Sequence, residues 1–65
     1  MQIFVNGETI QTEVITLNLL LEELGYKGNW LATAVNAEVV PVSKRSKFIL
    51  HEGDKIEILS PMQGG

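Results

Sequence analysis

The residues that could do chemistry lie at the end of the sequence, which finishes in Gly64-Gly65. A terminal carboxylate is unreactive until another protein converts it to an anhydride of the acyl-phosphate type. Glycine suits such a tail because it has no Cβ to block a narrow channel or to crowd an attacking nucleophile. We therefore predict a carrier in which Gly65 bears the transferred group on its carbonyl carbon. Met62, Gln63 and Gly64 are expected to thread into the active sites of partner proteins.

The composition excludes most other chemistries. The sequence has no cysteine and one histidine, which rules out a cysteine nucleophile, a thiolate-bound zinc ion and an all-histidine metal site within one chain. His51 stands beside Glu52 and near Asp54, a grouping that could suggest a metal ion or a general base. Because there is no second imidazole, we expect a solvated loop histidine. We predict that the chain holds no metal and no cofactor and is not an enzyme.

The charges are expected to be mainly solvated. The formal net charge is -3 and the sequence pI is about 4.9, which disfavours nucleic-acid binding because such domains concentrate positive charge. Lys44, Arg45 and Lys47 form a local basic patch, which we interpret as a solvated loop, with contact to acidic partner residues as the alternative. Glu22-Glu23 is interpreted as the exposed side of a helix.

Length and composition indicate one small domain. The chain has 65 residues, of which 45% are hydrophobic and 20% charged, a mixture too apolar for intrinsic disorder. No apolar run approaches the roughly 20 residues of a membrane span, and the first residues lack the features of a signal peptide. We expect a cytoplasmic protein that is monomeric when free. Residues 1–60 should form the domain and residues 61–65 a flexible tail.

The first third of the sequence predicts a β-hairpin. Residues 1–5 and 8–14 are strand-like, and Asn6-Gly7 between them is typical of a type I′ turn, whose two central residues need positive φ. Ile3 and Val5 alternate onto one face of the first strand. The hairpin should therefore place one apolar face toward the core.

A short amphipathic helix is predicted over residues 17–24, with the Thr16 hydroxyl as N-cap and Gly25 at the left-handed position that ends helices. Its apolar stripe has the spacing i, i+3, i+4 and i+7 and consists of Leu17, Leu20, Leu21 and Leu24. We expect Tyr26 and Trp30 to cover the end of this helix, or to anchor a partner if they are exposed.

The second half predicts further strands joined by tight connections. A strand over 31–36, rich in small residues, is expected to lie centrally beneath the helix. The remaining expectations are a connection at 37–38, a short strand at 39–40 halted by Pro41, an irregular segment at 42–47, a 3₁₀ turn at 48–50, a turn at 51–54 with Gly53 at positive φ, and a last strand at 55–59. Hairpin, helix and further strands in this order indicate an α+β fold of the β-grasp, or ubiquitin-like roll, type: a mixed sheet of four to five strands with one main helix packed on one face.

Several segments, in this order and spacing, carry a family resemblance over essentially the whole length. They are Met1 to Gly7, Ala34-Val35-Asn36, Val40-Pro41, Gly53 to Ile58 and the final Gly64-Gly65. On these segments the chain resembles the sulfur carrier proteins of thiamine biosynthesis, which are small ubiquitin-like proteins. That family usually has an arginine after the proline and a tryptophan three residues further on, where this chain has Val42 and Arg45.

The resemblance implies a reaction sequence on Gly65. An adenylating enzyme of the ubiquitin-activating type would use ATP to form an acyl-adenylate there. Sulfur from a persulfide donor, such as a cysteine desulfurase relay, would displace AMP and leave a C-terminal thiocarboxylate. Thiazole synthase would take that sulfur for the thiazole ring. The sheet face away from the helix, together with the last strand, would be presented to the adenylating enzyme with modest affinity, because a carrier must leave each partner.

Three other functions remain open on the sequence. The small subunit of molybdopterin synthase has the same tail chemistry and a different sulfur acceptor, although those subunits tend to be longer. A ubiquitin-like modifier would be joined to lysines of other proteins. A plain interaction domain would make no use of its terminal glycines.

Overall fold

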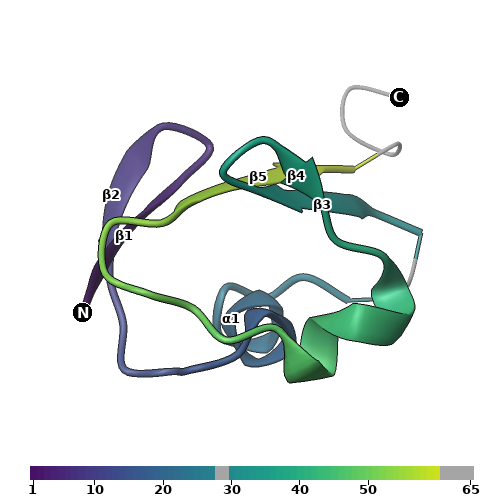
Figure 1. Ribbon diagram of the computed structural model, residues 1–65, viewed down its shortest axis with the longest axis horizontal. Helices are drawn as coiled ribbons and strands as arrows, with labels where there is room; N and C mark the ends of the chain where they lie inside the picture. The colour runs from purple at the N-terminus through teal and green to yellow at the C-terminus, as the bar shows by residue number, and fades with distance from the viewer. Residues whose placement is uncertain (28–29, 61–65) are drawn as a thin grey trace.

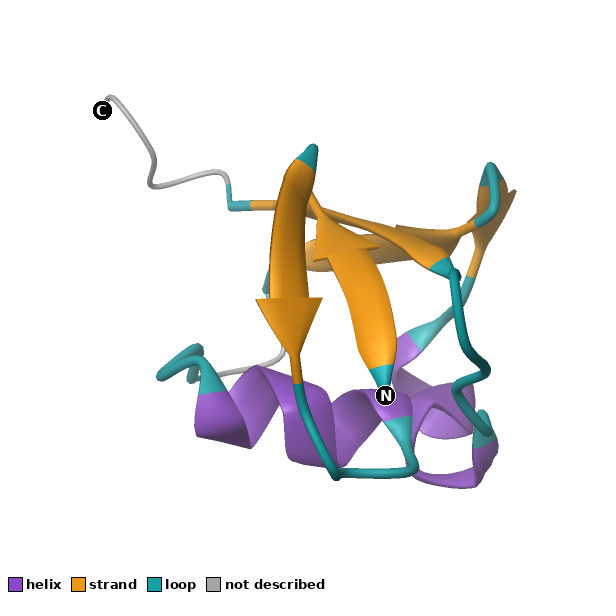
Figure 2. Cartoon of the chain, turned by 90° about the vertical axis from the view of Figure 1, so that its left-hand side faces the viewer, coloured by secondary structure: helices purple, strands orange, loops and turns teal. Residues whose placement is uncertain are grey.

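The computed structural model describes residues 1–27 and 30–60, and it forms two layers. A five-stranded sheet of strand order β2-β1-β5-β3-β4 lies over one α-helix and one 3₁₀ helix (Figures 1 and 2). The elements are β1 Gln2–Val5, β2 Glu8–Gln11, α1 Leu17–Glu23, β3 Ala32–Val35, β4 Glu38–Val39, η1 Val42–Lys47 and β5 Lys55–Leu59. The predicted α+β class, mixed sheet and β-grasp element order are confirmed.

The first hairpin turns as predicted. Asn6 has φ 49 and Gly7 has φ 86, the positive values that a type I′ turn needs. Strand β2 ends at Gln11, opposite Gln2, so the predicted extension to residue 14 is wrong. Beyond Gln11 only Thr12 still bonds the neighbouring chain: its amide bonds the Met1 carbonyl at 3.0 Å, and its carbonyl accepts from the Met1 amino group at 2.8 Å.

Strand β5 occupies the centre of the sheet. It pairs parallel with β1 and antiparallel with β3, with Val5 and Val35 both opposite Ile56. The prediction that the strand over 31–36 lies centrally with its small residues under the helix is therefore wrong. Thr33 and Val35 are the buried residues of β3, and the two alanines of that strand face away from the helix.

The helix buries its leucine stripe as predicted. Its buried residues are Leu17, Leu20 and Leu21, Leu24 is half-buried, and Gly25 follows with φ 88. Thr16 holds the N-cap position, but its hydroxyl donates to Asn18 Oδ1 at 2.7 Å and caps no backbone N–H. The expected side-chain cap is therefore wrong, because the Asn18 side chain takes the hydroxyl instead.

Two loops differ from the expectations. The turn between β3 and β4 lies at Asn36 and Ala37, with φ 51 and 72, one residue earlier than predicted. The 3₁₀ helix runs over Val42–Lys47, the segment expected to be irregular, and begins with a bond from the Lys44 amide to the Pro41 carbonyl at 2.9 Å.

The segment 48–50, expected to be a 3₁₀ turn, is extended instead. It pairs with the residues around the start of α1: the Leu17 amide bonds the Phe48 carbonyl at 3.1 Å, and the Leu50 amide bonds the Ile15 carbonyl at 2.8 Å. These long-range bonds satisfy its backbone groups and remove the need for a local turn.

The core lies between the inner face of the sheet and α1. Its buried hydrophobic residues come from every layer and are Ile3, Val5, Leu17, Leu20, Leu21, Leu31, Val35, Val40, Leu50, Ile56 and Ile58. No helix within residues 1–27 and 30–60 has the length and apolar character needed to cross a membrane.

Candidate functional site

The predicted tail residues Met62, Gln63, Gly64 and Gly65 lie outside the described residues. What the structure describes is the base from which they continue. Strand β5 leads to them, and its last residue, Leu59, is still paired with Ala32 of β3. β1 pairs with the first residues of β5, and β3 pairs with residues 56–59, so the chain leaves the sheet from its central strand, at a residue that β3 still holds (Figure 1).

An apolar surface lies beside this point, on the sheet face that points away from α1. Its large members are Leu59, which is 71% exposed, and Val39, which is 78% exposed. Ala34 lies opposite Val39, and Ala32 lies opposite Leu59, so the four side chains cover adjacent positions of β4, β3 and β5. We call these four residues the outer apolar strip. Ala32 is also exposed and Ala34 is half-buried, and contiguous apolar surface is a feature of sites that meet a partner protein.

The alternation of the last strand is a sequence signal for this strip. Ile56 and Ile58 point inward, so a strict alternation makes residue 59 point outward. A leucine at an outward position of the sheet cannot pack in the core and is therefore exposed. The same reasoning would have applied to Val39 only once its pairing with Ala34 was known.

Arg45 is buried, so the expected solvated loop is wrong for this residue. It is 4% exposed, whereas Lys44 and Lys47 are exposed as predicted. Its Nη2 donates to the Leu31 carbonyl at 2.6 Å, and its Nε donates to Thr33 Oγ1 at 3.0 Å. Desolvation lowers the pKa of the guanidinium, which still stays protonated at neutral pH. Arg45 thus ties η1 to the start of β3.

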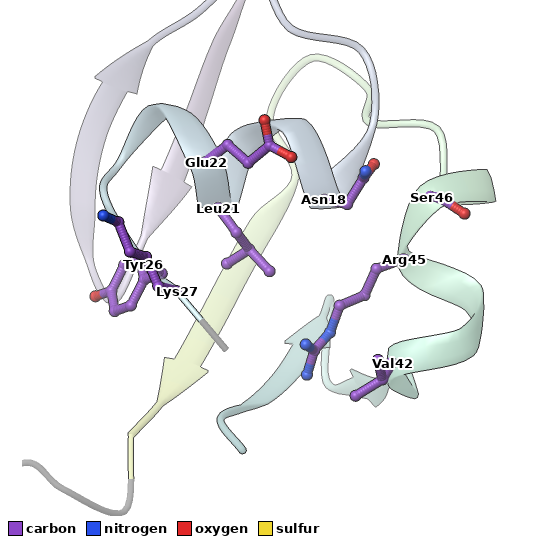
Figure 3. A pocket seen from close by; sticks show the side chains of 8 residues that line it. All are labelled: Asn18, Leu21, Glu22, Tyr26, Lys27, Val42, Arg45 and Ser46. Atoms are coloured by element: carbon purple, nitrogen blue, oxygen red, sulfur yellow. The ribbon is translucent and has the colours of Figure 1, made fainter. Parts of the chain in front are cut away.

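Arg45 also lines a cavity of about 460 Å³ between α1 and η1 (Figure 3). The lining includes Leu21 and Glu22 from α1, Tyr26 after it, and Val42 from η1. The cavity mixes apolar, acidic and basic groups, and the Arg45 guanidinium is already bonded to β3. We assign it no ligand.

The other candidate side chains are structural or solvated. His51 is exposed, and its Nδ1 lies 4.0 Å from Asp54 Oδ2. Asp54 is buried and accepts hydrogen bonds from the His51 amide at 2.8 Å and from Asn36 Nδ2 at 3.0 Å, which fixes the turn at Gly53, where φ is 84. No group of three or more side chains suited to a metal ion occurs in the described part of the chain.

The glutamates of α1 and the two aromatic residues after it are expected to lie on the helix surface and at its end, respectively. Glu22 and Glu23 are exposed as predicted, and Glu23 also accepts a hydrogen bond from the buried hydroxyl of Thr12. Tyr26 is half-buried against the core. Trp30 is 53% exposed, so the expectation that it covers the end of the helix is wrong, and its alternative role as a partner anchor stays a prediction.

Comparison with known proteins adds to this geometry. The model of the ThiS family matches residues 2–65, which is nearly the whole chain. The sulfur carrier protein ThiS of Escherichia coli is 32% identical to this chain, and the match covers all of both sequences. A thiazole synthase of Paramagnetospirillum magneticum is 35% identical over the full chain, which spans only 20% of that protein's length.

Solved structures agree with the fold. The crystal structure of the thiamine biosynthesis protein ThiS from Geobacter metallireducens is 25% identical to this chain, with a TM-score of 0.83 and full coverage of both chains. A solution structure of a thiamine biosynthesis protein from the same organism, also 25% identical, gives a TM-score of 0.82, covering all of this chain and 88% of the other. Sequence, fold and family model agree, and the chain belongs to the ThiS family.

Proposed function

We propose that this chain is the sulfur carrier of a thiamine pathway and that it holds the sulfur as a thiocarboxylate on Gly65. The observation that carries the proposal is the match of the ThiS family model to residues 2–65, which includes both terminal glycines. The composition supports the position of the sulfur. With no cysteine in the sequence, no side-chain thiol of this chain can carry it, and the carbonyl carbon of Gly65 can.

The proposed reaction has three steps. In the active site of an adenylating enzyme, the Gly65 carboxylate attacks the α-phosphorus of ATP and releases pyrophosphate. The terminal sulfur of a donor persulfide then attacks the acyl carbon, and AMP leaves. A thiol reduces the resulting acyl disulfide, which releases the thiocarboxylate and leaves the thiol oxidised to a disulfide with the donor. In this scheme the carrier supplies the acyl group, and the nucleotide and the catalytic groups belong to its partners.

Strand β5 and the outer apolar strip give this chain its proposed part in those steps. The strip lies on the sheet face opposite α1 and includes Leu59, the last residue of β5. A partner that covers the strip would receive the residues after Leu59 directly. Burial of Leu59 and Val39 would supply apolar contact, while the small area of the strip would keep the complex short-lived enough for the carrier to visit two enzymes.

Thiazole synthase is the proposed sulfur acceptor. The support is the similarity of this whole chain to 20% of a thiazole synthase, because it means that a carrier-like segment and that enzyme share one polypeptide elsewhere. The small subunit of molybdopterin synthase and a ubiquitin-like modifier have no comparable support.

The test is adenylation by the enzyme encoded in the same organism. We expect ATP–pyrophosphate exchange with the full chain and none after deletion of Gly65. Loaded carrier should then support thiazole formation by thiazole synthase, and it should not support molybdopterin formation by the molybdopterin synthase large subunit. Exchange that persists without Gly65, or transfer only to the molybdopterin enzyme, would contradict the proposal.

A further inference from the structure

The side chain of Asn6 holds the end of β5 through two hydrogen bonds. The Ile58 amide donates to Asn6 Oδ1 at 2.8 Å, and Asn6 Nδ2 donates to the Ile58 carbonyl at 3.2 Å. Both backbone polar groups of Ile58 are therefore bonded by one side chain that lies 52 positions away in the sequence. The Asn6-Gly7 pattern in the sequence indicates turn geometry alone.

These two bonds continue the parallel ladder after β1 has ended. The Asn6 amide still bonds the Ile56 carbonyl at 2.9 Å, as in a regular parallel pair. The main chain then turns into the hairpin at Asn6, where φ is 49, and can offer β5 no further backbone partner. The carboxamide of Asn6 has the same donor and acceptor as a peptide group, so it takes the place of the next pair of backbone hydrogen bonds in the ladder.

Loss of the Asn6 carboxamide would leave the amide and the carbonyl of Ile58 without hydrogen-bond partners. Ile58 is a buried core residue, and its amide and carbonyl point toward β1. Buried backbone groups that lose their partners favour local opening, which exposes them to water. Opening at Ile58 would also release Leu59, the residue from which the chain continues toward its terminus.

We propose that Asn6 is a positioning residue for sulfur loading: by fixing Ile58, its carboxamide fixes the place of Leu59, from which the chain continues toward Gly65. The proposal rests on the proposed function, since the tail must enter a partner's active site. An ordered strand end lowers the conformational entropy that is lost when the tail is seated. Once the tail is bound in the partner's active site, the reaction at Gly65 is the same whether or not Asn6 bonds Ile58.

A matched control lies at the other end of β5. Asn36 also has a positive φ, of 51, and also bonds through both side-chain atoms. Its Oδ1 accepts from the Lys55 amide at 3.0 Å, and its Nδ2 donates to Asp54 Oδ1 at 3.0 Å. Glycine accepts positive φ at either position without strain, so Asn6→Gly and Asn36→Gly each remove one side-chain clamp and preserve the turn.

The experiment measures adenylation kinetics and amide exchange for both variants at a temperature where each is folded. For Asn6→Gly we expect the KM for the carrier to rise about tenfold with kcat within about twofold, the pattern of lost binding rather than lost chemistry. For Asn36→Gly we expect both constants to match the wild type. Hydrogen exchange of the Ile58 amide should be about tenfold faster in Asn6→Gly than in Asn36→Gly.

Three results would overturn the proposal: wild-type kinetics in Asn6→Gly, an equal rise in KM in both variants, or unchanged exchange at Ile58. The equal rise would mean that general destabilisation explains the effect. If the wild-type chain is not adenylated at all, that result contradicts the proposed function and not the hydrogen bonding between Asn6 and Ile58. In that case the exchange data still decide whether Asn6 holds Ile58.

Discussion

At the scale of single residues, Ala37 adopts a backbone conformation that favours glycine. It is the second residue of the turn between β3 and β4, and its φ is 72. An L-residue with a Cβ pays about 1–2 kcal/mol in the left-handed region, because the Cβ approaches the following carbonyl oxygen. The same position of the first hairpin is Gly7, with φ 86. The two turns therefore differ in strain although they have the same form.

Replacement of Ala37 by glycine should raise the free energy of unfolding by about 1 kcal/mol, because it removes this strain at an exposed position. Urea denaturation at equilibrium would measure the change. Ala32→Gly is the matched control: Ala32 lies in extended backbone, so glycine there should lower stability by about 0.5–1 kcal/mol. Equal effects of the two substitutions would contradict the assignment of strain to residue 37.

Residue patterns placed the first turn correctly and the second turn one residue too late, for the same physical reason. Asn6-Gly7 is a turn signal because both residue types accept positive φ, whereas Asn36-Ala37 contains only one such residue. Arg45 was missed because its neighbours Lys44 and Lys47 indicate solvent. Its burial depends on two acceptors in the segment of β3, the Leu31 carbonyl and the Thr33 hydroxyl, which no local pattern brings near it.

At the scale of elements, α1 depends on the sheet for its stability. It has seven residues, well below the roughly 12–15 at which isolated helices become even marginally stable in water. Its hydroxyl cap is also absent, because Thr16 bonds Asn18. Burial of the leucine stripe must therefore supply most of the free energy that keeps the helix formed.

Leu20→Ala tests this dependence, because Leu20 is among the largest fully buried side chains. We expect a loss of about 2–5 kcal/mol in the free energy of unfolding, from lost apolar transfer and from the cavity that remains. Its neighbour Leu19 is exposed, and Leu19→Ala should change stability by no more than about 0.5 kcal/mol. Thermal or urea denaturation would show the difference, and similar losses in both variants would refute the assigned helix face.

The existence of most elements could be predicted from the sequence, and their arrangement could be predicted less well. Leucine spacing and strand alternation are local properties, so the helix and the last strand were placed to within a residue or so. The central position of β5 depends on pairs such as Phe4 with Lys55, which lie far apart in the chain. Local composition instead favoured β3 for the centre, because its alanines were assumed to face the helix.

At the scale of the whole molecule, one face of the sheet packs in the core and the other is the proposed partner surface. The helices lie on one side of the sheet (Figure 2). The inner face and α1 make the core, and the outer face carries the outer apolar strip, which includes Leu59 at the end of β5. The proposed partner surface can therefore change without loss of the fold. The sequence alone predicted the outer face as the partner surface, and the exposed Leu59 and Val39 name the side chains on which it would depend.

Leu59→Lys should weaken binding to the adenylating enzyme at least tenfold and leave stability nearly unchanged, because the side chain is mostly exposed in the free protein. Titration calorimetry with the enzyme would measure the affinity. Ile49→Lys is the matched control, since Ile49 is also exposed but pairs with Thr16 beside the start of α1. Equal weakening by both variants would argue against the outer apolar strip as the contact.

The central claim is that the terminal carboxyl group of Gly65 becomes the sulfur-bearing group. The most direct measurement is the intact mass of the chain after incubation with its adenylating enzyme, ATP and a sulfur donor. The account predicts a mass gain equal to the difference between one sulfur and one oxygen atom, located by fragmentation on Gly65 and absent when Gly65 is deleted. No gain in the full chain, or the same gain without Gly65, would contradict it.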